Sequence, residues 1–372
     1  MTNAYYTKGN YAPGDEVALL VSLGDGPSFT SQVRGGFYNG GNADVRPDTT
    51  ALGTNLRSFT QYHAVHEAAA SIIPVAGTWQ RTLGDQGVAC NLVVELKSYA
   101  SGNGQVAAQS FTVEGHSYTV PAMAGRIQLG NNTSVTGPWA YSYSQVVAGA
   151  IDGFLHRLLV ALRGKSAAQW INIQFASEVD TDNQWGTVDG STRSDWPTSD
   201  GQAVAAYTYM INWLKNPPAG IIGLPNHLAP VTFSMGWAGA WSGQAAFVRS
   251  HPASLPVDYL HWNVYNHGAN NSAYDNFMQT MTYRMQCAPE VQAKNVIVAE
   301  WGCNAAYDQA GYIVTVPAAL NQINALMALD GDGQYVMTNY FNSAGNTWGT
   351  LSPLAAGQQA LKTAYATSPY TS

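Results

Sequence analysis

Charged residues and cysteines are scarce in this chain, and each scarcity excludes a class of protein. Lys, Arg, Asp and Glu together make up 10% of the 372 residues, and the formal net charge is −7. No long run of one sign occurs, so the basic patch that nucleic acid or an anionic membrane would need is not expected. The three cysteines lack CxxC or Cys/His spacing, so neither a disulfide framework nor a zinc site is predicted.

Long hydrophobic runs and cofactor motifs are missing as well. No segment approaches about 18 uninterrupted apolar residues, and the N-terminus lacks a basic segment followed by an apolar one. The chain has no GxxxxGK[ST], no GxGxxG after a strand, no GxSxG and no HExxH. His63, His66 and Glu67 are spaced like a metal pair, but this spacing alone at a helix start is weak. We therefore predict no membrane span, no classical export signal, no cofactor and no metal.

Aromatic residues, by contrast, are abundant. The chain contains 11 Trp and 21 Tyr, and 46% of all residues are hydrophobic. Trp and Tyr offer flat apolar faces with a polar edge, on which sugar rings can lie, although many of them must simply pack. We expect a neutral partner such as a polysaccharide or oligosaccharide. We also expect a short N-terminal arm, residues 1–16, followed by one large domain, residues 17–372.

Short apolar runs recur along the chain at intervals that leave room for a helix, which predicts repeated βα units. The fold class predicted is α/β, a (β/α)8 TIM barrel with elaborated loops. Between strands we expect helical stretches at 145–165 and 201–216, a β excursion at 98–145 and another long loop at 180–201. The predicted strands are residues 17–23, 56–62, 91–97, 171–177, 231–237, 259–265, 296–302 and 335–341.

Two glutamates follow strands that lie on opposite sides of such a barrel. Glu178 comes after the fourth strand and Glu300 ends the seventh. Barrel enzymes carry their catalytic groups at these strand ends, and two carboxyl groups flanking a glycosidic bond can hydrolyse it. We predict Glu178 as acid/base and Glu300 as nucleophile, with their carboxyl groups about 5–5.5 Å apart if configuration is retained. The alternatives are a structural ion pair for Glu300 and a loop-surface carboxylate for Glu178, beside which Asp180 and Asp182 lie close enough in sequence to be mistaken for it.

Further polar and aromatic residues at strand ends suit a sugar-binding mouth. Tyr265 is expected to hydrogen-bond Glu300 and keep it ionised, and strand alternation puts His261 and Asn263 on the same face. Arg57 either supports a carboxylate inside the mouth or lies on the outer face. The tryptophans that serve either as stacking platforms or as packing are Trp185, Trp237, Trp241 and Trp301.

Three segments resemble glycoside hydrolase clan A, and most of all family 26, the β-mannanase-like group, across roughly residues 17–366. They are IQFASEVDTDNQWG, VDYLHWNVYNHG and VIVAEWGC. The resemblance implies acid/base, nucleophile and supporting-tyrosine roles for Glu178, Glu300 and Tyr265. The chain departs from the family at Ser177, a predicted substrate contact that stands where His or Asn is usual, and at the aromatic of the eighth strand, which shifts to Tyr340 or Phe341.

Two functions fit these observations. The first is an endo-acting, retaining glycoside hydrolase of a β-linked polysaccharide, either mannan-like or a cell-surface or cell-wall glycan. The second is a non-catalytic carbohydrate-binding or structural module of a phage tail or cell surface, motivated by the low charge, the polar N-terminal arm and Ser177. Either function would place the protein outside the cell or on a virion.

Overall fold

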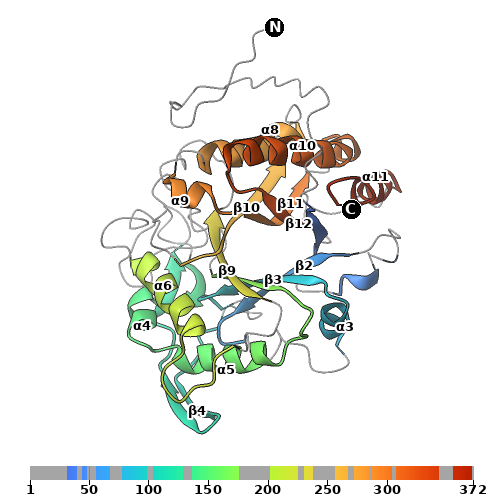
Figure 1. Ribbon diagram of the computed structural model, residues 1–372. Helices are drawn as coiled ribbons and strands as arrows, with labels where there is room; N and C mark the ends of the chain where they lie inside the picture. The colour runs from blue at the N-terminus through green and yellow to red at the C-terminus, as the bar shows by residue number, and fades with distance from the viewer. Residues whose placement is uncertain are drawn as a thin grey trace.

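The computed structural model contains a closed barrel of eight parallel strands, in the order β1-β12-β11-β10-β9-β8-β3-β2 (Figure 1). The predicted (β/α)8 barrel is therefore confirmed. The predicted arm, residues 1–16, and the boundary at residue 17 stay predictions, because they lie outside the described residues. The structure describes residues 32–39, 44–47, 50, 56–67, 78–98, 104–128, 136–175, 202–224, 230–237, 256–266, 272–284, 287–303, 307–342 and 355–370.

Seven of the eight barrel strands coincide with predicted strands. The barrel strands are β1 Arg34–Asn39, β2 Ser58–Ala64, β3 Ala89–Glu95, β8 Ile171–Phe175, β9 Val231–Trp237, β10 Tyr259–Asn266, β11 Val296–Cys303 and β12 Tyr335–Asn342. We refer to the end of the barrel formed by the carboxyl ends of these strands as the mouth.

Residues 17–23 lie outside the described residues, but the prediction that they supply the first barrel strand is wrong, because β1 closes the barrel between β2 and β12. Two glycines explain why β1 has no apolar run. A Cβ atom on Gly36 would lie 1.8 Å from the Ser58 carbonyl oxygen, and one on Gly35 would lie 2.8 Å from the Tyr370 ring. Close approach of a neighbouring backbone selects glycine at such positions.

Helices cover the barrel on several sides. Figure 1 shows α8 and α10 along one side and α4, α5 and α6 along another. The single helix predicted at 145–165 is in fact two helices, α4 and α5, separated at Gly149, whose φ of 79° leaves the right-handed helical region. The helices are α3 Trp79–Asp85, α4 Tyr143–Val147, α5 Asp152–Arg163, α6 Gln202–Lys215, α8 Ala273–Arg284, α9 Pro289–Gln292, α10 Gln309–Asp330 and α11 Ala355–Tyr365.

Among the described residues, α10 is long and apolar enough to cross a membrane by length and composition alone. In the structure it packs against α8, α11 and β11 instead. Its buried side chains include Ile313, Leu320 and Ile323. It therefore serves as a core helix of the barrel.

The segment between β3 and α4 forms the predicted β excursion. It contains two antiparallel hairpins, and the first of them packs on α5, where the Phe111 and Phe154 rings stack 5.6 Å apart. The second predicted loop, residues 180–201, lies outside the described residues. The hairpin strands are β4 Gln109–Val113, β5 His116–Val120, β6 Gly125–Gln128 and β7 Thr136–Ala140.

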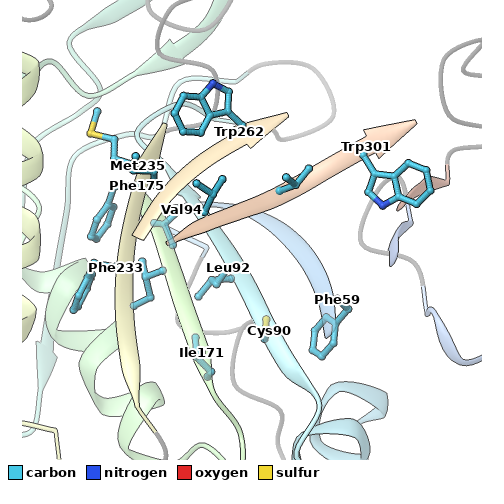
Figure 2. Packing of buried hydrophobic residues seen from close by; sticks show 14 of the residues in the cluster. Phe59, Cys90, Leu92, Val94, Ile171, Phe175, Phe233, Met235, Trp262 and Trp301 are labelled. Carbon is cyan, nitrogen blue, oxygen red and sulfur yellow. The ribbon is translucent and has the colours of Figure 1, made fainter. Parts of the chain in front are cut away.

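The outer face of the barrel strands is apolar, whereas much of the inner face is polar. Outward-facing side chains form the apolar layer under the helices, for example Phe59, Leu92 and Phe175 (Figure 2). The inner face carries buried polar side chains such as Asn91 and Asn172, which bond one another. Barrel interiors are more often filled by Val, Ile and Leu. Hydrogen bonds, which are directional, therefore set much of the geometry inside this barrel.

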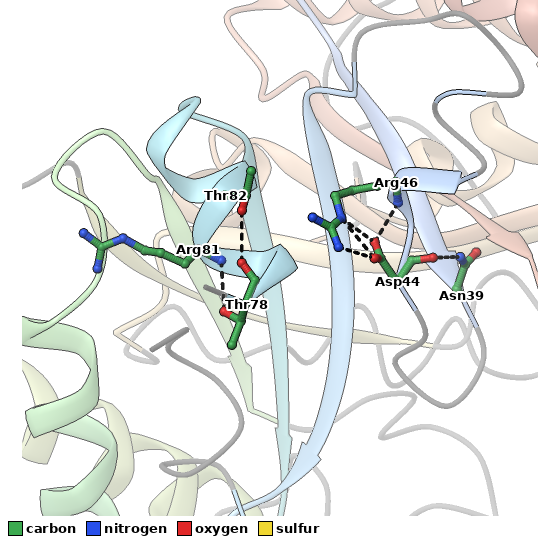
Figure 3. Close-up of polar contacts among 6 residues, drawn as sticks. All are labelled: Asn39, Asp44, Arg46, Thr78, Arg81 and Thr82. Atoms are coloured by element: carbon green, nitrogen blue, oxygen red, sulfur yellow. Dashed lines mark hydrogen bonds and ion pairs between the residues drawn. The ribbon is translucent and has the colours of Figure 1, made fainter. Parts of the chain in front are cut away.

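Local hydrogen bonds hold the described residues that follow β1 and those at the start of α3 (Figure 3). Asn39 Nδ2 donates to the Asp44 carbonyl oxygen over 3.0 Å, and the Arg46 guanidinium lies 2.7 Å from the Asp44 carboxylate. Thr78 caps α3, since its side chain accepts from the Arg81 backbone N–H. Asn39 ends β1 at the mouth, so the first bond anchors one part of the mouth's rim.

Candidate active site

Glu300 and Tyr265 meet at the mouth. Tyr265 lies near the end of β10 and Glu300 lies on the adjacent strand β11, and the phenol hydroxyl of Tyr265 donates a hydrogen bond to Glu300 Oε2. Both side chains are partly buried. A hydrogen bond from a neutral donor favours the ionised carboxylate and fixes its orientation. The contact that the sequence predicted between these two residues is present.

A β-bulge in β11 turns Glu300 toward the barrel interior. Val298 pairs with Trp262 of β10, but the next residue of β10, Asn263, pairs with Glu300. The register toward β12 shifts in the same stretch of β11, between Val298 and Trp301. One extra residue reverses the alternation of side chains beyond it. Val298 faces the outer apolar layer, and without the bulge Glu300 would face that layer too.

A buried chain of side chains positions Asn263 beside Glu300. Gln174 Nε2 donates to His261 Nδ1 over 2.8 Å, and His261 Nε2 in turn bonds Asn263 Oδ1 over 3.0 Å. This pattern requires the neutral imidazole with its hydrogen on Nε2. Burial lowers the pKa of His261 to about 3, which agrees with that state. The neutral ring thus holds the Asn263 amide in one orientation.

Four half-buried aromatic rings form a wall at the mouth next to Glu300. Tyr38 stacks on Phe341 with ring centroids 5.1 Å apart and touches Tyr62 at 4.8 Å. Phe341 meets Tyr265 edge to face at 6.3 Å. We name Tyr38, Tyr62, Phe341 and Tyr265 the aromatic wall. Of the two positions that the sequence offered for the aromatic of the eighth strand, Phe341 belongs to this wall, whereas Tyr340 is buried.

Tyr38 and Tyr62 were not predicted as site residues. Tyr38 lies on β1, the strand that the sequence pattern missed. Tyr62 lies near the carboxyl end of β2, which was predicted, so its position at a strand end was the available signal.

A buried ion pair was also missed. Glu95, which is 1% exposed, ends β3 and lies 2.8 Å from Lys97 Nζ. The signal in the sequence was a pair of opposite charges two positions apart, Glu95 and Lys97, at the end of an apolar strand. Each charge compensates the other in a site shielded from water, so we assign this pair a structural role.

Three of the predicted substrate contacts are contradicted. Trp301 is not a stacking platform: it is 0% exposed and belongs to the outer apolar layer (Figure 2), where it packs edge to face on Tyr340 and Phe277. Arg57 precedes β2 and therefore lies at the end of the barrel opposite the mouth. There, burial of Arg34 and, to a smaller extent, the nearby charge of Arg57 lower the pKa of Arg34. His261 is 0% exposed and therefore acts below the surface of the site rather than on a ligand.

The structure does not decide the roles of the remaining predicted site residues. Asn263 is 1% exposed in this structure, so a direct contact with substrate stays a prediction. Trp237 ends β9, but its side chain lies outside the described part of the chain. The other predicted site residues outside the described residues are Ser177, Glu178, Trp185 and Trp241.

Within the described residues, His, Cys, Asp and Glu side chains form no group of three or more that could hold a metal ion. His63 and His66 are both shifted toward the neutral form, since burial lowers the pKa of His63 to about 4 and also lowers that of His66.

Comparisons with known proteins identify the fold. No family model and no curated protein sequence matches the chain. Among solved structures, a double mutant of the Cellulomonas fimi endo-β-1,4-mannanase is similar, with a TM-score of 0.53 and 13% identity over 92% of this chain and 72% of that one. A second structure from Cellulomonas fimi, described as a modular endo-β-1,4-mannanase of glycoside hydrolase family 26, gives a TM-score of 0.51 and 14% identity, with the same coverage of both chains. The family 26-like barrel that the resemblance of the strand-end segments implied is thus confirmed at the level of the fold.

Proposed function

We propose that the protein is a retaining, endo-acting glycoside hydrolase of a β-linked polysaccharide. The observation that carries this proposal is Glu300, turned into the mouth by a bulge, held by Tyr265 and flanked by the aromatic wall. A carboxylate at the end of the seventh barrel strand, fixed by a phenol, is suited to attack an anomeric carbon. Glu178, which follows the fourth strand, is the proposed acid/base.

The proposed reaction has two steps. In the first, a Glu300 oxygen attacks the anomeric carbon while the bond to the leaving oxygen breaks, and the Glu178 carboxyl gives its proton to that oxygen. In the second, a water molecule gives a proton to Glu178 and attacks the same carbon, which releases Glu300 as a carboxylate. Configuration at the anomeric carbon is inverted twice and hence retained.

The aromatic wall supports a carbohydrate as the substrate. Faces and edges of Tyr and Phe rings suit the apolar C–H faces of a sugar, and phenol hydroxyls add hydrogen bonds at the edge. Because the similar structures are endo-β-1,4-mannanases, mannan is the first substrate to test, followed by cell-surface and cell-wall glycans. Such substrates fit a protein that acts outside the cell or on a virion.

Release of reducing ends tests the proposal. Purified protein is incubated with mannan, β-glucan, xylan and bacterial cell-wall glycan, beside the Glu300→Gln variant and a matched control, Glu290→Gln. Glu290 is an exposed carboxylate in the first turn of α9. We expect hydrolysis by the wild type and the control and a loss of at least about a thousand-fold for Glu300→Gln. Full activity of Glu300→Gln would reject the assignment.

A mechanism-based label identifies the nucleophile directly. A 2,4-dinitrophenyl 2-deoxy-2-fluoro-β-glycoside, tried as the mannobioside and the cellobioside, should leave its sugar covalently attached to one carboxylate. Peptide mass spectrometry should place that sugar on Glu300 and not on Glu290. Attachment elsewhere would overturn the role given to Glu300, whereas inversion of the product configuration, followed by NMR, would overturn the two-step mechanism.

The second candidate function is a non-catalytic carbohydrate-binding module on the same barrel. Ser177 favours it, since this residue stands where the resembling enzymes carry His or Asn next to the acid/base. Binding of a glycan without release of reducing ends over prolonged incubation would support the module. Release that depends on Glu300 would support the enzyme.

A further inference from the structure

The bulge in β11 presents Glu300 to the mouth, and the question is what keeps the bulge in place. Ala299 has no partner residue in the register toward either β10 or β12. A bulged residue of this kind leaves its backbone groups outside the regular ladder. A buried backbone carbonyl without a hydrogen bond is costly, so the bulge needs a donor from elsewhere.

Thr60 provides that donor from a strand that is not adjacent. Its Oγ1 lies 3.0 Å from the Ala299 carbonyl oxygen, across the barrel interior from β2 to β11. Strands β1 and β12 separate β2 from β11 in the barrel. Thr60 is almost fully buried, so water does not compete for this bond.

The direction of the Thr60 hydroxyl is set by two further buried side chains. Asn339 Nδ2 donates to Thr60 Oγ1 over 2.7 Å, and Ser58 Oγ donates to Asn339 Oδ1 over 2.6 Å. Because the Thr60 oxygen accepts from Asn339, its own hydrogen is directed to Ala299. The series Ser58, Asn339, Thr60 and the Ala299 carbonyl thus runs in one direction and ends at the residue before Glu300.

We infer that Thr60 is a positioning residue for Glu300, acting through the Ala299 carbonyl. Its hydroxyl holds the bulge, and the bulge places the Glu300 carboxylate against Tyr265. The role in turnover rests on the proposed function, whereas the role in geometry does not. Thr60 itself touches no reacting atom.

The test replaces Thr60 by Val, which keeps the shape and removes the hydroxyl, and by Ser, which keeps the hydroxyl. Thr338→Val is the matched control: Thr338 is a buried threonine of β12 beside Val298 in the register, but its hydroxyl bonds Tyr370 over 2.7 Å and not the Ala299 carbonyl. Kinetics use the glycan cleaved by the wild type and the 2-fluoro mannobioside or cellobioside. We expect Thr60→Val to lower kcat and the labelling rate about ten-fold or more with KM nearly unchanged.

Thr60→Ser should restore both rates to within about two-fold of the wild type, and Thr338→Val should leave them unchanged. Thr60 would have only a general packing role if Thr60→Val and Thr338→Val lowered kcat and the labelling rate equally. The same conclusion would follow if Thr60→Ser were as impaired as Thr60→Val. Should Thr60→Val not fold, Thr60→Cys, whose thiol is a weaker donor, is expected to show an intermediate loss.

Crystal structures of the variants separate this inference from the proposed function. If the wild type cleaves no glycan, the hydrolase proposal fails, and the geometry still decides the role of Thr60. In Thr60→Val the Glu300 carboxylate should move beyond hydrogen-bond distance from the Tyr265 hydroxyl, or β11 should lose its one-residue shift. Thr60→Ser should retain both features. An unchanged bulge and an unchanged Glu300–Tyr265 contact in Thr60→Val would overturn the inference.

Discussion

The contact between Tyr265 and Glu300 allows a quantitative prediction. Tyr265→Phe removes only the hydroxyl that donates to Glu300 Oε2, and the ring keeps its edge-to-face contact with Phe341. A hydrogen bond to a charged group is worth about 1.5–3 kcal/mol, and about 1.36 kcal/mol corresponds to a ten-fold change in rate. We therefore expect kcat to fall by roughly ten- to a hundred-fold.

The assay compares kcat and KM of Tyr265→Phe with those of Tyr312→Phe. Tyr312 is a buried tyrosine of α10 whose hydroxyl accepts from Asn276 Nδ2 of α8 over 3.2 Å, so its bond lies between two outer helices and not at Glu300. Both variants lose one phenol hydroxyl, so they share any general cost of that loss. The reasoning would be refuted by equal kcat values for the two variants. A rise in KM with an unchanged kcat would show that Tyr265 binds substrate instead of supporting Glu300.

Three further predictions concern the barrel, its buried histidine and the aromatic wall. Gly36→Ala should destabilise the fold by at least about 3 kcal/mol in thermal unfolding, because its Cβ would lie 1.8 Å from the Ser58 carbonyl oxygen, whereas Gly104→Ala, with nothing within 4 Å, should be neutral. His261 has a folded pKa of about 3, below the value of about 6.5 expected when unfolded, so it lowers stability as pH falls from 6.5 toward 3. Between pH 7 and pH 5 the wild type should lose about 2 kcal/mol more in urea unfolding than His261→Gln, and equal losses would show that His261 is not the group responsible. Phe341→Ala should raise KM for the glycan more than it lowers kcat, and an unchanged KM would exclude the wall as a sugar platform.

The sequence was sufficient for most of the barrel because seven of its strands are apolar runs with polar residues at their ends. Strand β1 was missed because its signal is different. Gly35 and Gly36 are there to let the Tyr365 and Tyr370 rings and the β2 backbone approach, and such contacts between distant segments leave no periodic pattern. Missing β1 also meant missing Tyr38 in the aromatic wall.

The predicted roles of Arg57 and Trp301 at the mouth were wrong for reasons of strand geometry. Arg57 stands at the start of a predicted strand, so its place at the end opposite the mouth was already implied by strand direction. Trp301 follows Glu300 directly, and alternation sends neighbouring side chains to opposite faces, so a mouth-facing Glu300 entails an outward Trp301. What alternation could not supply was the bulge itself, since Val296 and Val298 face outward and predict the same for Glu300.

Two buried hydrogen-bond networks end on the two strands that carry Glu300 and Tyr265. One runs from Ser58 through Asn339 and Thr60 to the β11 bulge. The other is longer and ends at Asn263 of β10, and its members are Asn172, Asn91, Gln174 and His261.

Apolar packing resists compression but tolerates small rotations, whereas a hydrogen bond weakens as soon as its angle changes. A barrel interior rich in amides and hydroxyls therefore fixes the relative orientation of β10 and β11 more sharply than one filled by Val and Leu side chains alone. The polar side chains reduce the apolar area that the barrel buries on its inner face. They also hold the Glu300 carboxylate and the Tyr265 phenol at one separation. The unusual composition of the inner face is thus explained by the demands of the site above it.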